Sequence, residues 1–492
     1  MHKISYFCLK SIALQRKFII NLALLLLLNF LIKPFWIFGI DRTVQNMVPS
    51  ADYGIYFALF NFSILFSILL DLGLTNYNNK NIAQNNHILS KYFSGLLTFK
   101  FLLSLIYFLV TFVVGYVVGY DSARFSMLLF LSINQFLISL ILFMRSNISG
   151  LQLFGMDSLL SVLDKVLMII FCAVLLWGNV INEPFAILHF RYAQTAAYLL
   201  TAIVVFAIIV FKTKVFTFQL NLPFLLVTLK QTFPYAFLVL TMTFYYRLDA
   251  IMLDLMLPDG EHEAAIYAQA YRLLDATSQI GVLFAGLLLP MFALMIAQKQ
   301  KLDDLLRLSF SLLFIPSAVL AIFCLFYAEQ IISLLYANHE QSSSNVLILL
   351  MFCFVAIAGT YVYGTLLTSK GSLKQLNFIA VIGLILNFVL NLILIPTYKA
   401  EGSAIASLIT QFIVLTAQIF VCNMIFNFAL NYQYIYKVAL FFVVILAIIF
   451  GLKSVDVSLQ ISFLITVLLS SVLVFLFKII SLKDILQLIK NR

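Results

Sequence analysis

A series of long apolar runs constrains this fold more than any other feature of the sequence. Two of the clearest are "NLALLLLLNFLI" at 21–32 and "IYFALFNFSILFSILL" at 55–70. A helix needs about 20 predominantly apolar residues to cross the hydrocarbon core of a bilayer. Hydrophobic residues make up 63% of the 492 residues and charged residues only 10%, whereas soluble domains carry about 25% charged residues. The sequence therefore predicts an all-α polytopic membrane protein.

Hydropathy along the chain predicts fourteen transmembrane helices. The first is interpreted as a retained span and not as a signal peptide, because its apolar part is too long and no small-residue cleavage site follows it. Within the eighth span, Gly281 and Gly286 are expected to allow close helix contacts. The predicted spans are 18–46, 53–73, 92–118, 123–146, 157–178, 183–211, 231–257, 263–297, 303–327, 342–368, 373–396, 402–428, 434–452 and 457–478.

Lysine and arginine set the predicted orientation of these helices. Basic residues cluster before the first span and in alternate loops after it, and the opposite loops hold little beyond Arg42, Arg124, Lys399 and Lys453. Since basic loops stay on the cytoplasmic side, both termini are predicted to be cytoplasmic. Cytoplasmic loops near anionic lipid also explain the net charge of +10. Membrane lipids are therefore expected partners, and nucleic acid is not.

The cysteines, histidines and short loops predict no catalytic or metal chemistry. The five cysteines and five histidines are dispersed along the chain and show no spacing typical of a metal or redox motif. No metal and no cofactor is predicted. Glu261, His262 and Glu263 are interpreted as solvated loop residues and not as an acid–base set.

The chain resembles itself at an offset a little over two hundred residues. "DYGIYFALFNF" matches "EAAIYAQAYRL", and the paired positions are Asp52 with Glu263, Gly155 with Gly371, and Lys33 with Arg247. Duplicated six-helix units are a common plan in transporters, with the substrate site between the repeats. We therefore expect an N-terminal six-helix lobe at 1–211, an interfacial linker at 212–230, a C-terminal six-helix lobe at 231–428, and two additional helices with a tail at 429–492.

Four cations lie where the pattern predicts lipid: Lys33, Arg191, Arg247 and Arg272. With a rise of about 1.5 Å per residue, Arg247 and Arg272 lie roughly 15 and 13 Å from the outer ends of their spans. Arg191 is predicted at a comparable depth, and Lys33 near the middle of its span. A charge that faces lipid costs at least about 2.5–3.5 kcal/mol, so these cations are expected to face a cavity or a partner. The fork-shaped guanidinium donors of arginine and the compact ammonium charge of lysine, placed at one depth, suit an anionic substrate such as a phosphate or pyrophosphate.

The acids in the spans, Asp71, Asp249, Asp254 and Asp275, admit two interpretations. In the first they pair with cations: Arg272 and Asp275 are three residues apart on one helical face, and Arg247 and Asp254 are two turns apart. Asp249 could also reach a cation on the eighth span. In the second, Asp71, Asp249 and Asp275 titrate or bind a cation and couple transport to an ion gradient. The sequence leaves both interpretations open.

Three stretches resemble a known family. They are "DYGIYFALFNFSILFSILLDLGL" at 52–74, "YRLDAIMLDLML…EAAIYAQAYRLLDA" at 246–276 and "LNFVLNLILIPTYKAEGSAIASLIT" at 386–410. Together they resemble the polysaccharide flippases, the Wzx-like branch of the multidrug/oligosaccharidyl-lipid/polysaccharide exporter superfamily. The resemblance covers nearly the whole chain. It implies a V-shaped pair of six-helix lobes around a cationic central cavity that opens alternately to each side.

The resemblance also implies a substrate and a location. The substrate would be an undecaprenyl-pyrophosphate-linked oligosaccharide, moved to the periplasmic leaflet of a bacterial inner membrane, as for lipopolysaccharide O-antigen. Lys33, Arg191, Arg247 and Arg272 would hold the pyrophosphate while the lipid tail stays in the bilayer. No bond is broken, so no catalytic residue is expected. A polysaccharide polymerase is a further candidate partner.

Three alternatives stay open. A drug/cation antiporter of the same superfamily usually has twelve spans and relies on membrane acids more than on cations. A lipid II flippase shares the fourteen spans and the cationic cavity. A membrane oligosaccharide polymerase typically carries a large external loop, whereas the external connections here, such as "MLPDGEHEAA" and "YANHEQSSSN", are short.

Overall fold

The structure is a computed structural model that describes residues 27–29, 31–75, 78, 88–151, 153–178, 180, 183–213, 222–428 and 431–480. Over these residues the regular structure is helical and contains no β-strand, which confirms the predicted all-α class. The chain divides into two compact units, Met1–Thr243 (unit 1) and Phe244–Arg492 (unit 2). The division falls within one helix, α9.

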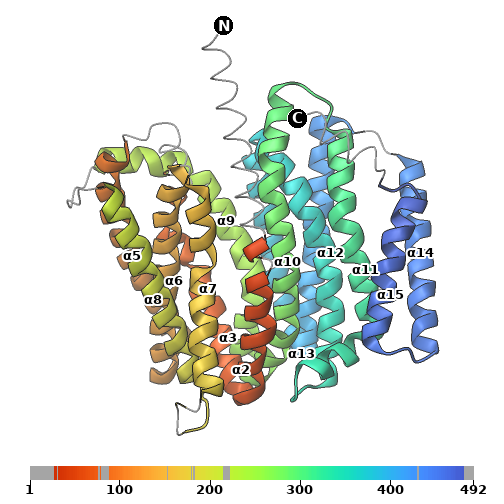
Figure 1. Cartoon of the computed structure of the whole chain (residues 1–492), viewed down its shortest axis with the longest axis horizontal. Coiled ribbons are helices and arrows are strands. Elements are labelled where there is room, and N and C mark those ends of the chain that lie inside the picture. The colour runs from red at the N-terminus through yellow and green to blue at the C-terminus, as the bar shows by residue number, and fades with distance from the viewer. Residues whose placement is uncertain are drawn as a thin grey trace. The chain divides into compact units, whose positions relative to one another are not determined.

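Unit 1 has a core formed by its four long helices. Leucine, phenylalanine and other apolar side chains of α5, α6, α7 and α8 form one buried cluster that includes Phe143, Met144 and Val205. The elements of unit 1 are η1 (Trp36–Asp41), α2 (Arg42–Met47), α3 (Ser50–Leu65), η2 (Ser67–Leu70), α5 (Ile88–Val118), α6 (Ser122–Gly150), α7 (Phe154–Trp177), α8 (Ile187–Thr213) and most of α9 (Leu222–Met256) (Figure 1).

The second predicted span, 53–73, is interrupted in the structure. α3 ends at Leu65, and a short 3-10 turn follows it. The backbone then takes positive φ angles at Leu72 (46°) and Gly73 (84°). A Cβ on Gly73 would lie 2.9 Å from Thr232 of α9. Glycine therefore suits this position for two reasons: it tolerates the positive φ angle, and it has no side chain to clash with Thr232.

Unit 2 is organised around α12, which packs against α10, α11 and α13. The last two helices, α14 and α15, pack beside α11 (Figure 1) around an apolar core that includes Phe323, Phe441 and Ile445. The helices of unit 2 after α9 are α10 (Gly260–Ala297), α11 (Asp303–Leu335), α12 (Gln341–Lys370), α13 (Leu373–Phe426), α14 (Tyr432–Ser454) and α15 (Leu459–Leu476).

The described residues do not confirm the predicted number of fourteen spans. Eleven described helices are long and apolar enough to cross a membrane. One of them, α13, holds two predicted spans, 373–396 and 402–428. These two helical segments meet at a kink, where Lys399 has a non-helical backbone (φ 52°, ψ −129°). The first two predicted spans add none: residues 1–26 and 30 lie outside the described residues, and α3 has only 16 residues. Fourteen therefore stays a prediction.

The predicted lobes and linker also stay predictions. Part of the linker at 212–230 cannot be compared, because residues 214–221 lie outside the described part of the chain. The remainder is helical, since α9 already begins at Leu222. The predicted tail after 480 lies outside the described residues as well.

The two glycines of α10 have different surroundings. A Cβ on Gly281 would lie 2.2 Å from the ring of Tyr361 on α12, which confirms a close helix contact at this position. A Cβ on Gly286 would meet no described atom within 4 Å. The expectation of a close contact is therefore wrong for Gly286, which faces open space.

Candidate functional site

Two arginines and one aspartate form a charged cluster within the spans of unit 2. Arg247 Nη2 of α9 lies 3.5 Å from Asp275 Oδ1 of α10, and Arg272 Nη1 lies 3.8 Å from Asp275 Oδ2. The Arg247 guanidinium also lies 5.5 Å from the ring centroid of Tyr271, one turn before Asp275 on the same helical face. We call Arg247, Arg272 and Asp275 the arginine cluster. Its three groups carry a net charge of +1.

The arginine cluster tests the predicted ion pairs. The pairing of Arg272 with Asp275 along α10 is confirmed by the 3.8 Å distance. Arg247 takes Asp275 of the neighbouring helix as a salt-bridge partner, which spacing along its own helix does not predict. Asp254, the partner that the sequence predicts for Arg247, is a buried residue of α9.

Asp249 lies in a separate node of neutral hydrogen-bond donors. Its carboxylate accepts from Tyr267 Oη (2.7 Å), Asn391 Nδ2 (2.8 Å) and Asn387 Nδ2 (3.3 Å), and from the Ser407 hydroxyl. Asp249 is only 1% exposed. We call these five residues the Asp249 node.

The donors of the Asp249 node correct one expectation. The sequence allowed Asp249 a cation on the eighth span, but the partner from that helix, α10, is the phenol of Tyr267. Within the described part of the chain, no Lys, Arg or His nitrogen lies within 4 Å of this carboxylate. The other donors come from both halves of α13, on either side of Lys399. The node therefore joins α9, α10 and α13 through one buried carboxylate.

Unit 1 holds a comparable set of charges built from lysines. Lys165 Nζ of α7 lies 3.4 Å from Asp164 Oδ2 and 3.0 Å from the hydroxyl of Tyr198 on α8. Its ammonium also lies 5.6 Å from the ring centroid of Trp36. Lys33 interacts electrostatically with both Asp164 and Lys165. We call Lys33, Asp164 and Lys165 the lysine cluster: Lys165 pairs with Asp164, and Lys33 lies within the electrostatic range of both.

Arg191 lies closer to a helix end than the sequence predicts. The sixth predicted span starts at 183, but α8 starts at Ile187, so Arg191 is only about 6 Å along the helix. Its guanidinium packs 4.7 Å from the ring centroid of Phe130, and Nη1 lies 3.5 Å from Ser126 Oγ. Ser126 is in the second turn of α6, whereas Asp164, a neighbour of Lys33, lies near the middle of α7. Arg191 therefore lies nearer the end of its helix than predicted.

Asp71 forms an ion pair with a buried lysine, which the sequence did not predict. Lys100 Nζ of α5 lies 2.6 Å from Asp71 Oδ1 and 2.7 Å from Ser139 Oγ. The Lys100 side chain is 2% exposed, so the pair holds α5 against the interrupted second span. This geometry favours the structural interpretation of Asp71.

Charges within predicted spans also include three that sequence reasoning passed over. Lys100 lies eight residues inside the span 92–118, and Asp164 and Lys165 lie near the middle of the span 157–178. The same signal that singled out Lys33, a charge within an apolar run, marks all three.

A network of charged side chains joins the connections at one end of unit 2. Lys399 Nζ contacts Asp259 and lies 3.0 Å from Glu263 Oε1. The other oxygen of that carboxylate, Oε2, accepts the backbone N–H of Ala400. His262 Nε2 lies 2.7 Å from Glu340 Oε1. The hydrogen bond from Lys399 lowers the pKa of the Asp259 carboxyl.

This network corrects the interpretation of Glu263 as a solvated loop residue. Its side chain is 7% exposed and lies in the first turn of α10. Burial is tolerated there because Lys399 and the Ala400 N–H both satisfy its carboxylate.

Comparison with known proteins adds a family and a fold. The sequence model of a family described as "Polysaccharide biosynthesis protein" matches residues 18–296. No curated protein matches the chain. The structure of the lipid II flippase MurJ in an inward closed conformation is similar, with a TM-score of 0.66 at 15% identity over 95% of this chain and 98% of that chain.

Two further solved structures share the fold. An inward-facing multidrug resistance MATE family transporter of the MOP superfamily gives a TM-score of 0.62 at 15% identity, over 82% of this chain and 94% of that chain. A MOP superfamily transporter from Pyrococcus furiosus gives 0.59 at 14% identity, over 83% and 95%. At these identities the likeness shows the fold alone.

Proposed function

The chain belongs to the polysaccharide biosynthesis protein family, and on this premise we propose that it is a flippase for a lipid-linked oligosaccharide. The proposed substrate is an undecaprenyl-pyrophosphate-linked oligosaccharide. It moves from the cytoplasmic to the outer leaflet of a bacterial inner membrane by alternating access, with both termini of the protein in the cytoplasm. The fold shared with MOP superfamily transporters supports transport, and the family supports a polysaccharide precursor.

The arginine cluster is the observation that carries this proposal. Asp275 lies beside both Arg247 and Arg272, and each guanidinium offers five N–H donors in a fixed fork. Two guanidinium groups beside one carboxylate leave an excess of one positive charge, which favours a second anion at this site. Fork-shaped donors match the oxygens of a pyrophosphate. We assign Arg247 and Arg272 to the pyrophosphate and Asp275 to holding them in place.

We assign the lysine cluster a matching role in unit 1. Lys165 pairs with Asp164 and Lys33 lies within the electrostatic range of both, so two cations and one carboxylate come together as in the arginine cluster. Arg191 is included as a further anion contact, nearer the end of its helix. Its guanidinium stacks on Phe130 and keeps its edge available for hydrogen bonds.

We propose that the Asp249 node couples transport to an ion gradient. A buried carboxylate without a cationic partner is costly within a membrane span, so its charge is best neutralised by a proton or a monovalent cation. Tyr267, Asn391 and Ser407 approach it from two other helices. Occupation of the node would therefore change how α9, α10 and α13 are held together. Asp71, which is paired with Lys100, is assigned a structural role.

A strain that lacks the gene tests the proposed function. The measurement is the amount and the sidedness of undecaprenyl-pyrophosphate-linked oligosaccharide in the inner membrane. We expect this lipid to accumulate in the cytoplasmic leaflet and to reach the outer leaflet again when the intact gene is restored. Normal outer-leaflet glycan in a strain without redundant flippases would contradict the proposal and favour a drug exporter. Accumulation of lipid II instead would favour a lipid II flippase.

A further inference from the structure

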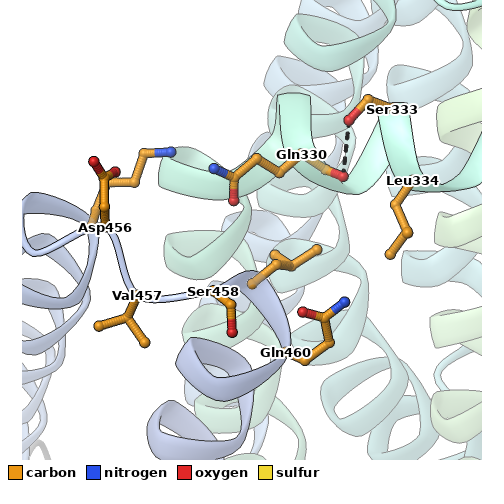
Figure 2. A pocket seen from close by; sticks show the side chains of 9 residues that line it. Gln330, Ser333, Leu334, Asp456, Val457, Ser458 and Gln460 are labelled. Atoms are coloured by element: carbon orange, nitrogen blue, oxygen red, sulfur yellow. Dashed lines mark hydrogen bonds between the residues drawn. The ribbon is translucent and has the colours of Figure 1, made fainter.

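A polar pocket lies where α11 and α14 end and α15 begins (Figure 2). Its volume is about 370 Å³. Figure 2 shows Gln330 and Ser333 on one side of it, and Asp456, Ser458 and Gln460 on the other. Both α14 and α15 are long and apolar enough to span a membrane, so the pocket lies at a membrane boundary. We call it the headgroup pocket.

Two opposite charges line the headgroup pocket without pairing with each other. Lys453 and Asp456 are both lining residues. Among the described residues neither side chain has a salt-bridge partner within 4 Å. The Lys453 ammonium lies 5.0 Å from the ring centroid of Tyr327, which holds it over α11. The pocket thus offers one cation and one anion to the same occupant.

Further hydrogen-bonding groups surround these charges. Ser458, the N-cap residue of α15, makes no side-chain capping hydrogen bond, so the first-turn N–H groups of that helix are available as donors. Gln330 and Gln460 add amide groups. The combination of a cation, an anion and amides is complementary to a zwitterion.

An apolar groove of about 290 Å³ follows the same two helices within the membrane span. It is lined by Val319 and Phe323 of α11 and by Phe463, Val467 and Ser471 of α15. The Ser471 hydroxyl donates to the Val467 carbonyl at 2.7 Å. Its hydrogen-bonding need is therefore met within α15, and the serine is compatible with an apolar groove. Phe463 is one turn after Gln460 of the headgroup pocket. The two sites therefore follow each other along one helix pair.

We propose that the headgroup pocket and the groove together bind one phospholipid with a zwitterionic, primary-ammonium headgroup. Lys453 holds the lipid phosphate, Asp456 holds the ammonium, and one acyl chain fills the groove. The order of the sites matches the order of these groups in the lipid, with the charges at the boundary and the chain at hydrocarbon depth. The lipid would fasten α15 to α11 and so fix the C-terminal helix pair. This inference does not rest on the transported substrate.

Native mass spectrometry of the full-length protein in detergent tests this site. The probes are phosphatidylethanolamine, phosphatidylglycerol and undecaprenyl phosphate, each added at equal concentration. We expect phosphatidylethanolamine to be retained in preference, with one lipid per chain. Lys453→Gln should weaken retention of phosphatidylethanolamine by about threefold or more, since an ion pair at a wet site is lost. Asp456→Asn should remove the preference over phosphatidylglycerol, and Lys437→Gln at the other end of α14 should change nothing.

Two further measurements separate the lipid from its free headgroup. Ser471→Phe fills the groove and should reduce lipid retention, while soluble phosphoethanolamine should not displace the lipid. Equal retention by wild type, Lys453→Gln and Asp456→Asn would overturn the proposal. Tighter binding of undecaprenyl phosphate than of phosphatidylethanolamine would overturn it too, as would full displacement by soluble phosphoethanolamine.

Discussion

Arg247 on α9 and Asp275 on α10 form an ion pair within the membrane spans of unit 2, with 3.5 Å between Nη2 and Oδ1. The same carboxylate lies 3.8 Å from Arg272 Nη1. One carboxylate therefore lies beside two guanidinium groups, and the cluster keeps a net charge of +1.

Removing either guanidinium should slow transport strongly without loss of protein. Each charge-assisted hydrogen bond contributes about 1.5–3 kcal/mol, so Arg247→Gln or Arg272→Gln should slow transport by about tenfold or more. Arg247→Lys should restore part of the rate, since it keeps the charge and loses the fork. The measurement is flipping rate together with the amount of folded protein. If the variants lose folded protein in proportion to transport, the ion pair is structural. A double variant with the charges exchanged, Arg272→Asp with Asp275→Arg, gives a second test. Full transport by this double variant would exclude substrate binding by the pair.

The lysine cluster should behave in the same way. Lys165→Gln removes a cation that contacts Asp164 and Tyr198, and we expect a loss of transport of about tenfold. Lys301→Gln, at an exposed position before α11, is the matched control and should leave transport unchanged. Equal rates for the two variants would remove the lysine cluster from the substrate site.

Asp249→Asn should uncouple transport from the ion gradient. The amide cannot carry the negative charge that a proton or cation neutralises, so accumulation against a gradient should fall to the background of empty vesicles. Substrate exchange without a gradient should continue, and this readout separates coupling from folding. Gradient-driven transport at the wild-type rate would show that the Asp249 node has no part in coupling.

The two glycines of α10 form a matched pair for a stability test. Gly281→Ala places a methyl group 2.2 Å from the Tyr361 ring, and overpacking of this kind costs about 1–3 kcal/mol. Gly286→Ala meets open space and should be neutral or stabilising by up to about 1 kcal/mol. Thermal unfolding of the detergent-solubilised protein measures both. Similar midpoints for the two variants would show that α10 and α12 are not in close contact at Gly281.

The Lys399–Asp259 contact predicts a small pH-dependent effect. The hydrogen bond from Lys399 lowers the pKa of Asp259 in the folded protein. The contact therefore stabilises the fold above the unfolded carboxyl pKa of about 3.9, and it is lost as the pH falls through the lower folded value. Asp259→Asn should lower the melting temperature at pH 7 by at most about 2 °C, because the pair is exposed. That difference should shrink below pH about 4; a difference that grows there would contradict the assignment.

The sequence predicts the helices well because hydropathy is a local property. A charge within an apolar run is equally visible, and it marks Lys33, Arg247 and Arg272. The pairing of Arg272 with Asp275 also follows from spacing, since both lie on one helix. The same signal marks Lys165.

Contacts between helices are beyond such reasoning. Ser407 and Asp249 are 158 residues apart in the chain, and serine or asparagine hardly disturbs an apolar pattern. The depth of Arg191 differs from the prediction for a local reason. Pro184 disfavours helix at the residue before it, and the Ala186 N–H donates to His189 Nδ1, so α8 begins later than hydropathy suggests.

Flipping by the purified protein tests the central claim most directly. The protein is reconstituted into vesicles with undecaprenyl-pyrophosphate-linked oligosaccharide, and the fraction of glycan accessible to an external glycosidase is followed with time. The account predicts that the wild-type protein makes nearly all of the glycan accessible, and that Arg247→Gln or Arg272→Gln protein exposes it at least about tenfold more slowly. Half of the glycan remaining protected with the wild-type protein, under every ion gradient tried, would contradict it.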